Sequence, residues 1–297
     1  MVNHIPVMLK EVLHYLSIKN DGTYIDCTFG SGGHSIEIVK KLSERGKLFL
    51  LDWDCETVKY YREKFSRYKN TKWICENFAN LNSVVKKTGI KNIDGFLFDL
   101  GFSFLQIEDR TRGFSFNFAA PLDMRYNKDN LLTAKEVINS YSKKELQGIL
   151  KEFADEQFAE KIADGICRYR LKKKIETTKE LIEVIKTATP VWYHNKKGGR
   201  IHFATKTFQA LRIAVNNELD NIKKGISSAI KLVSSGGRIV VLSYHSIEHR
   251  LLKNIFRDAE RNQLIKLVVK KPVFPSANEI FLNPRSRSAQ LRIIEKR

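Results

Sequence analysis

The sequence contains few cysteines and no long apolar run. Its four cysteines are Cys27, Cys55, Cys75 and Cys167, and they form neither a C-x-x-C pair nor a metal-ligand spacing. We therefore expect a reduced intracellular protein without structural zinc or disulfide bonds. No apolar stretch approaches the roughly 18 to 20 residues that span a bilayer, and no basic segment followed by an apolar one opens the chain. These absences predict a cytoplasmic protein with no membrane partner and no secretory signal.

Acidic residues are also scarce relative to basic ones. The 297 residues include 52 Lys and Arg against 33 Asp and Glu, a formal net charge of +19. The net charge is +3 over residues 1–130, +6 over 131–206 and +10 over 207–297. Such an excess favours a polyanionic partner, although a solvated basic surface without a partner is the alternative. Hydrophobic residues make up 42%, which is enough for a sizeable core.

Strand and helix patterns alternate through the first hundred residues. Short apolar runs predict strands over residues 24–29, 47–52, 72–75 and 95–101, with helical spacing between them. Strands separated by helices of this length indicate right-handed βαβ units and an open parallel sheet. The fold class predicted from this pattern is therefore α/β.

This alternation breaks after Gly101. Residues 102–130 are predicted to form a long ordered loop, and 133–189 are helical in pattern, with capping-box spacings at Thr133 and Thr178. Helices are expected over 208–219 and 222–233, a strong strand over 238–245, and a final antiparallel pair at 266–271 and 290–294. The predicted domains are a first catalytic part (1–130), an inserted helical domain (131–206) and a second catalytic part (207–297).

A glycine-rich loop lies between the first strand and the first helix after it. Its pattern is Asp26-x-Thr28-x-Gly30-x-Gly32-Gly33-His34, and Asp52 ends the next strand about 20 residues on. Glycines at a helix N-terminus let a ligand approach the backbone, and the acid can bind both ribose hydroxyls. A tight turn alone is the alternative. Because the pattern is G-x-G-G rather than G-x-G-x-x-G, it favours a nucleoside without phosphate, such as S-adenosylmethionine, with Phe78 beside the adenine.

Asp99 ends the fourth strand, at the edge where open α/β sheets bind ligands. Ser103 and Gln106 follow in a polar turn. Methyl transfer to C5 of cytosine needs a cysteine nucleophile at this strand end, and none is there. Attack by an exocyclic amine needs positioning and a hydrogen-bond acceptor, which Asp99 or Ser103 can supply. A helix-capping role for Asp99 is the alternative.

Ordered motifs along nearly the whole chain resemble the MraW/RsmH family, the 16S rRNA cytosine-N4 methyltransferases of bacteria. These motifs are His4-x-Pro6-Val7, Tyr24-Ile25-Asp26-x-Thr28-x-Gly30-x-Gly32-Gly33-His34-Ser35, Asp99-Leu100-Gly101-x-Ser103-x-x-Gln106, Arg112-Gly113-Phe114-Ser115-Phe116, Pro121-Leu122-Asp123-Met124-Arg125, the run from Thr207 to Asn216, Gly236-Gly237-Arg238, His245-Ser246-x-Glu248 and Asn283-Pro284-Arg285-x-Arg287-Ser288.

The resemblance implies a Rossmann-like class I S-adenosylmethionine-dependent methyltransferase with an inserted helical domain for substrate recognition. It implies methylation of N4 of a cytidine in the decoding centre (P site) of 16S rRNA, within the small ribosomal subunit. Asp99 and Ser103 are the predicted catalytic residues, and no metal is expected. The cofactor S-adenosylmethionine is expected to bind to Gly32, Gly33, His34, Asp52, Phe78, Asp99 and Gln106.

Some positions depart from the family pattern, namely Phe102, Phe104, His249 and Ala154. Phe104 stands where the family usually has a second serine, which leaves Asp99 and Ser103 as the acceptors. The alternatives are a basic RNA-binding or ribosome-assembly factor without catalysis and an amino-methyltransferase with another nucleic-acid target. An NAD-dependent dehydrogenase would need the full G-x-G-x-x-G, which is absent. The oligomeric state stays open, a homodimer included.

Further positions have two interpretations each. His245 could face the target base or be structural. Asp123 and Arg125 could bind substrate or pair with each other. Phe114 and Phe116 could stack on a base or pack under the loop. Three basic clusters are candidates for phosphate contacts, with a solvated surface as the alternative: Lys172-Lys173-Lys174, Lys196-Lys197-x-x-Arg200 and Arg285-x-Arg287.

Overall fold

The computed structural model describes residues 5–116, 118–194 and 202–297, so the predicted cluster at Lys196, Lys197 and Arg200, like His4, lies outside the described residues. The chain divides into two compact units. The first comprises Met1–Phe104 and Leu219–Arg297, and the second comprises Leu105–Glu218. Each unit has its own hydrophobic core.

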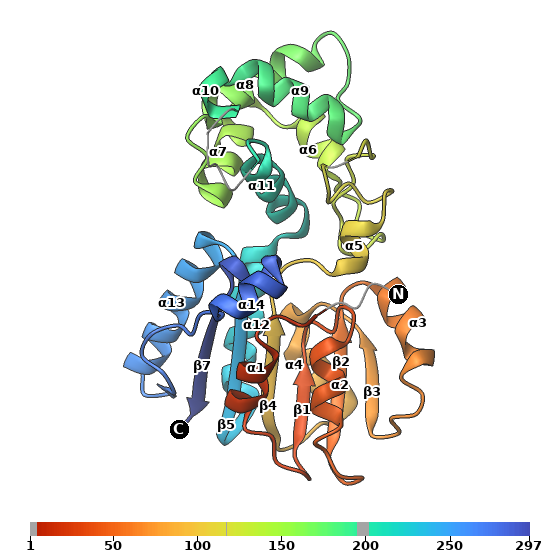
Figure 1. The fold of residues 1–297 in the computed structure, drawn as a ribbon, viewed down its shortest axis with the longest axis vertical. Helices are drawn as coiled ribbons and strands as arrows, with labels where there is room; N and C mark the ends of the chain where they lie inside the picture. The colour runs from red at the N-terminus through yellow and green to blue at the C-terminus, as the bar shows by residue number, and fades with distance from the viewer. Residues whose placement is uncertain (1–4, 117, 195–201) are drawn as a thin grey trace. The chain divides into compact units, whose positions relative to one another are not determined.

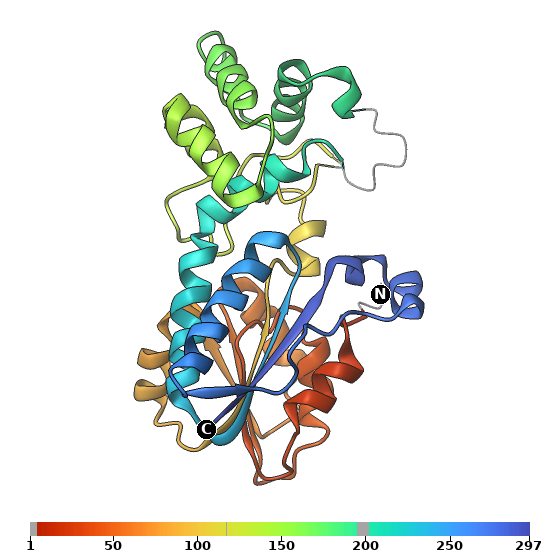
Figure 2. The ribbon, with the colours of Figure 1, turned by 90° about the vertical axis from the view of Figure 1, so that its left-hand side faces the viewer.

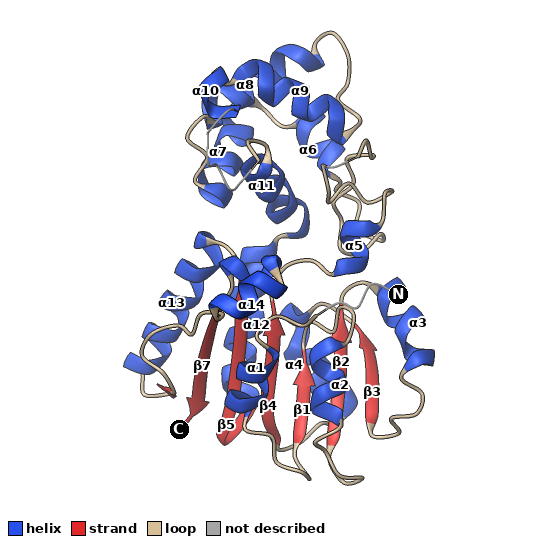
Figure 3. Cartoon of the chain, in the orientation of Figure 1, coloured by secondary structure: helices blue, strands red, loops and turns tan. Residues whose placement is uncertain are grey.

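The first unit is built on a seven-stranded sheet with the order β3-β2-β1-β4-β5-β7-β6 (Figures 1 and 3). Its strands are β1 (Thr23–Asp26), β2 (Lys47–Asp52), β3 (Thr71–Cys75), β4 (Ile93–Asp99), β5 (Val233–Ser243), β6 (Ile265–Leu267) and β7 (Gln290–Lys296). The first five run parallel, while β7 is antiparallel to both β5 and β6. The open parallel sheet and the final antiparallel pair are therefore confirmed.

Helices cover both faces of this sheet, because each central strand is apolar on both sides. In β2, Leu48 and Leu50 pack into one core cluster, while Phe49 and Leu51 pack into the other. The first cluster includes residues of α1 (Leu9–Leu16) and α2 (Gly33–Val39), and Tyr61 of α3 (Cys55–Lys64) packs against it. The second includes α4 (Leu81–Thr88), α12 (Glu218–Leu232) and α13 (Ser246–Arg261). Figure 2 shows this layered arrangement from the side.

Three short elements complete the first unit: η1 (Phe78–Asn80), α14 (Ala277–Leu282) and η2 (Pro284–Ser288). Strand β5 begins five residues before the predicted start at 238, and its register against β4 shifts between Ile93 and Gly95. Within the described part of the chain, no helix has the length and apolar character needed to cross a membrane.

The second unit is helical and larger than the predicted insertion of 131–206. Its helices are α5 (Phe104–Glu108), α6 (Ala134–Ser140), α7 (Lys143–Ala154), α8 (Ala159–Arg170), α9 (Thr178–Ala188), α10 (Val191–His194) and α11 (Thr205–Asn216). The preceding loop belongs to the same unit because Leu122 and Met124 are buried in its core. The capping box at Thr133 is confirmed, whereas the second is formed by Thr177 rather than Thr178.

The expectation that no disulfide bond forms is wrong. Cys55 and Cys75 are disulfide-bonded, with their Cα atoms 5.3 Å apart. Asp52 is opposite Cys75 in the β2–β3 ladder, and Cys55 begins α3 three residues later. Sheet pairing therefore brings together two cysteines that are 20 residues apart in sequence.

Candidate active site at the carboxyl edge of the sheet

The predicted site residues of the first unit follow strands β1, β2, β3 and β4 at one edge of the sheet. Because these strands are parallel, their carboxyl ends lie at the same edge. The glycine-rich loop follows β1, while Asp52 and Asp99 are the last residues of β2 and β4. Strands β2 and β4 both pair with β1, so the two carboxylates flank the loop.

The glycines of the loop serve two different purposes. Gly32 has a left-handed φ of +79°, and a Cβ added there would lie 2.6 Å from the rings of Phe29 and Phe65. A Cβ at Gly33 would lie 2.4 Å from Pro6, so both positions need glycine for packing. At Gly30 the nearest contact of an added Cβ would be 3.7 Å away. The loop is therefore closely packed at Gly32 and Gly33, whereas a Cβ at Gly30 would make ordinary van der Waals contacts with Ser103 and Thr28.

Asp52 is anchored by the backbone on both sides. Its Oδ2 accepts a hydrogen bond from the Gly30 N–H (2.8 Å), and its Oδ1 accepts one from the Asp54 N–H (2.9 Å). Burial is the main cause that raises the pKa of this carboxyl, to about 6. A carboxylate oxygen can accept more than one hydrogen bond, so both oxygens can still accept the two hydroxyls of a ribose. The residue fits its predicted role.

Asp99 lies close to three neighbours. The Tyr244 hydroxyl donates to its Oδ1 (2.6 Å), the His34 Nδ1 lies 3.6 Å from its Oδ2, and its own N–H donates to the Thr28 hydroxyl (2.6 Å). The pKa of the Tyr244 phenol is raised well above its usual value, mainly by burial and further by the negative charge of Asp99 and the hydrogen bond to Asp99. The phenol therefore stays protonated and donates. The Asp99 side chain is 25% exposed. It is therefore both oriented and accessible.

Two further residues shape the site, Tyr244 and Asp26, although neither was predicted to have a role there. Leu242 is opposite Asp99 in the β4–β5 ladder, and Tyr244 follows two residues later. The buried Asp26 carboxylate accepts hydrogen bonds from the Thr28 N–H (3.1 Å) and the Ser35 hydroxyl (2.5 Å), and burial raises the pKa of this carboxyl. Asp26 thus fixes the shape of the glycine-rich loop.

The remaining predicted residues differ in how the structure places them. His34 is buried, with its Nε2 2.9 Å from the Val7 carbonyl oxygen, so Nε2 is the donor and Nδ1 faces Asp99. Ser103 lies beside Gly30. Phe78 packs edge-on against Phe98, 5.6 Å between ring centres, and lines the core. Gln106 is buried on α5, in the second unit.

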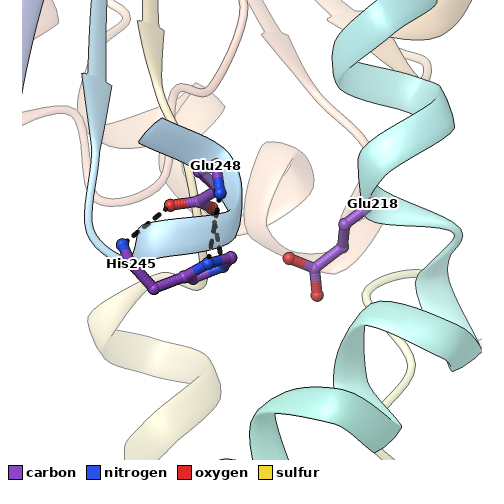
Figure 4. Close-up of side chains that lie close together, drawn as sticks. All are labelled: Glu218, His245 and Glu248. Atoms are coloured by element: carbon purple, nitrogen blue, oxygen red, sulfur yellow. Dashed lines mark hydrogen bonds and ion pairs between the residues drawn. The ribbon is translucent and has the colours of Figure 1, made fainter. Parts of the chain in front are cut away.

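The structure shows His245 in a helix-capping position. His245 is the N-cap of α13, where its Nδ1 accepts from the Glu248 N–H (3.4 Å). Its Nε2 lies 3.2 Å from Glu248 Oε1, and Figure 4 shows the ring and the carboxylate facing each other. The Glu248 carboxylate also accepts from the Tyr244 N–H (2.7 Å). This reciprocal cap fixes the chain just after Tyr244.

The other paired candidates are also accounted for by contacts within the protein. Arg125 binds both carboxylate oxygens of Asp123, at 2.9 and 2.7 Å, so the pairing of these two residues is confirmed. Phe114 stacks on Tyr126, and Phe116 packs with residues of the helical core, as the packing alternative expected. In the cluster Lys172-Lys173-Lys174 all three lysines are exposed, and Lys173 pairs with Glu180 at 2.6 Å.

The sheet order, the single antiparallel strand β7 and the carboxylates at the carboxyl edge together define a class I S-adenosylmethionine-dependent methyltransferase, as predicted. A solved structure from Clostridium thermocellum, named as an rRNA methylase, has this fold with a TM-score of 0.50 at 12% identity, covering 99% of this chain and 100% of that one.

The chain belongs to the MraW methylase family, whose profile matches residues 1–297. It is 41% identical over 311 residues to the ribosomal RNA small subunit methyltransferase H of Halothermothrix orenii, covering 100% of this chain and 99% of that protein. The protein of the same name from Malacoplasma penetrans is 41% identical over 304 residues, covering 99% of this chain and 96% of that protein. The predicted family and the predicted enzyme class are confirmed.

Proposed function

We propose that this methyltransferase transfers a methyl group from S-adenosylmethionine to N4 of a cytidine in the decoding centre (P site) of 16S rRNA. Its partner is the small ribosomal subunit, in the cytoplasm. The observation that carries the proposal is the Asp99 carboxylate, which the Tyr244 hydroxyl orients at the end of β4 beside the glycine-rich loop. The names of the relatives support the choice of small-subunit rRNA as substrate.

The cofactor would be held mainly by the first unit. Asp52 accepts hydrogen bonds from the ribose hydroxyls. The loop around the cofactor is formed by Gly32, Gly33 and His34, and Asp99 lies on the other side of this loop. Phe78 and, from the second unit, Gln106 complete the proposed set. When bound, S-adenosylmethionine supplies a methyl group that its sulfonium makes electrophilic. The Asp52 carboxylate, anchored beside the glycine-rich loop, fits a ligand of this kind.

The protein's own contribution to the reaction is alignment. The Tyr244 hydroxyl donates to Oδ1 of Asp99, and because a carboxylate oxygen can accept more than one hydrogen bond, the oriented carboxylate can also accept one from the cytosine amine. That bond would orient the amine, and Asp99 would accept the proton that the nitrogen loses when it gains the methyl group. Ser103, beside Gly30, is the second acceptor. A cytosine amine engaged in base pairing is inaccessible, so the target nucleotide must be unpaired or flipped out.

The proposal is tested by supplying methyl-labelled S-adenosylmethionine with purified small subunits lacking the modification, or with protein-free 16S rRNA. Label in the rRNA is expected with at least one of these substrates. The variant Asp99→Asn is expected to lower the transfer rate while the protein keeps its thermal stability. A protein that binds S-adenosylmethionine but labels neither substrate would refute the rRNA target. Failure to bind S-adenosylmethionine would instead support the non-catalytic alternative.

A further inference from the structure

One surface of the first unit is both aromatic and basic. It is formed by Phe281 and Leu282 at the end of α14 and by Arg285 and Arg287 in η2, and we call it the α14–η2 surface. Phe281 is 82% exposed and Leu282 is 62% exposed. Both arginines are also exposed. The two exposed apolar side chains are consecutive in the sequence, so the surface offers a ring and a neighbouring apolar group to a partner.

The chain holds this surface in a defined shape. The Ser276 hydroxyl caps α14 by accepting from the Glu279 N–H (3.1 Å). After α14, the chain turns through η2 and buries Ser286, whose hydroxyl donates to the Asn283 carbonyl (2.8 Å). Because Ser286 is anchored inward, the residues on either side of it, Arg285 and Arg287, lie on the exposed side of the turn. The arginines are thus presented by a fixed backbone.

Hydrogen bonds connect this surface to the candidate active site. Glu279 Oε1 accepts from the Met8 N–H (2.5 Å), and the Asn283 side-chain amide donates to the Ile5 carbonyl (3.1 Å). The same N-terminal segment contacts the glycine-rich loop, since the Val7 carbonyl accepts from His34. Figures 1 and 2 show α14 at the carboxyl end of the parallel strands. The surface therefore borders the edge of the sheet where transfer takes place.

The charge of this segment favours a polyanion over a protein partner. Residues 268–289 contain four basic side chains, at Lys270, Lys271, Arg285 and Arg287, and all four are exposed. The one acidic residue of the segment, Glu279, uses its carboxylate to hold the Met8 backbone. Exposed aromatics beside arginines are how proteins bind single-stranded nucleic acid, because bases stack on the rings while cations meet the phosphates.

We propose that the α14–η2 surface binds the single-stranded RNA next to the target cytidine. Phe281 stacks on a base of the substrate, and Arg285 and Arg287 contact its phosphates. The inference rests on the proposed function, because it names how that substrate is held. It also gives a role to the motif Asn283-Pro284-Arg285-x-Arg287-Ser288, which the reaction itself does not use.

The test measures binding of the full-length protein to purified small subunits and to a protein-free 16S rRNA fragment that contains the decoding centre. Phe281→Ala is expected to weaken binding to both about tenfold, the loss expected when one stacked base is given up. Phe281→Trp should bind like the wild type and Phe281→Leu like the alanine variant, because only a ring can stack. The double variant Arg285→Ala/Arg287→Ala should lower the slope of log affinity against log salt by about 1.4.

Matched control variants lie at the opposite edge of the sheet. Leu264→Ala removes an exposed apolar side chain beside β6, and Lys86→Ala/Lys87→Ala removes two exposed cations from the end of α4. These variants should bind RNA like the wild type. The affinity for S-adenosylmethionine and the melting temperature should be unchanged in all variants, since none of these side chains lies in the cofactor site.

Each outcome decides the inference. Unchanged RNA binding in Phe281→Ala, or wild-type binding by Phe281→Leu, would overturn the stacking role. Weaker binding to the subunit but not to the RNA fragment would overturn it too, in favour of a ribosomal protein as the partner. Failure of the proposed function looks different, because the wild-type protein would then transfer no methyl group to rRNA. The inference alone fails if the wild type methylates rRNA and the variants bind it equally well.

Discussion

The affinity for S-adenosylmethionine should depend on pH through one carboxyl group, Asp52. Burial raises the pKa of Asp52 to about 6, so the free site holds a proton below that pH. A protonated carboxyl is a weaker acceptor for the ribose hydroxyls, so binding must first release this proton. The affinity should therefore be constant above pH 7 and about tenfold lower at pH 5, one unit below the pKa.

Two substitutions separate charge from shape at this position. Asp52→Ala removes two charge-assisted hydrogen bonds to ligand, together about 3 kcal/mol, and should raise Kd about 100-fold. It also leaves the Gly30 and Asp54 N–H groups without their acceptor. Asp52→Asn keeps the size and one acceptor oxygen but cannot titrate. Its affinity should be lower than that of the wild type at pH 7 and flat between pH 5 and 7.

The assay is isothermal titration calorimetry with S-adenosylmethionine at pH 5, 6, 7 and 8. Asp21→Asn is the control, since this exposed carboxylate pairs with Arg45 and lies outside the site. It should retain the pH dependence of the wild type. A wild-type affinity that does not change between pH 5 and 7, or undiminished affinity in Asp52→Ala, would refute the ribose-binding role of Asp52.

Other perturbations test the surroundings of the site and the two cores. Tyr244→Phe removes the 2.6 Å hydrogen bond to the carboxylate that ends β4, and single-turnover transfer should slow about tenfold; an unchanged rate would argue against a positioning role. Cys55→Ser removes the disulfide and should lower the free energy of unfolding, measured in urea without reductant, by about 3 kcal/mol. Cys167→Ser changes a free cysteine and should not lower it. Equal losses in the two variants would be inconsistent with the disulfide. Arg212→Ala leaves the buried Glu218 carboxylate without its cation and should destabilise the helical unit by about 3 kcal/mol. The loss should appear as a lower urea concentration at the midpoint of unfolding. An unchanged midpoint would contradict a stabilising role for this ion pair.

The centre of the sheet could be predicted from the sequence because strands such as β2 and β4 are short and mostly apolar. The strand at Lys47–Asp52 is predicted with the bounds that the structure has. The local pattern is sufficient there, since the strand is buried on both faces. Parallel pairing then places Asp52 and Asp99 at one edge without further information.

What could not be predicted depends on contacts between distant residues. The loop at 102–130 has no periodic pattern, yet Ala120 and Thr178 are hydrogen-bonded, which makes the loop part of the helical unit. Tyr244 is not recognisable as a neighbour of Asp99 until β5 is paired with β4. The Cys55–Cys75 bond likewise depends on the register of β2 and β3, which a spacing of 20 residues does not reveal.

The most direct test of the proposed reaction identifies the methylated nucleoside. After transfer from labelled S-adenosylmethionine to small subunits or 16S rRNA, the rRNA is digested to nucleosides and analysed by mass spectrometry. The oriented carboxylate at Asp99, together with the lack of a cysteine at the end of β4, predicts label in N4-methylcytidine. Label in 5-methylcytidine, or in any nucleoside other than cytidine, would contradict it.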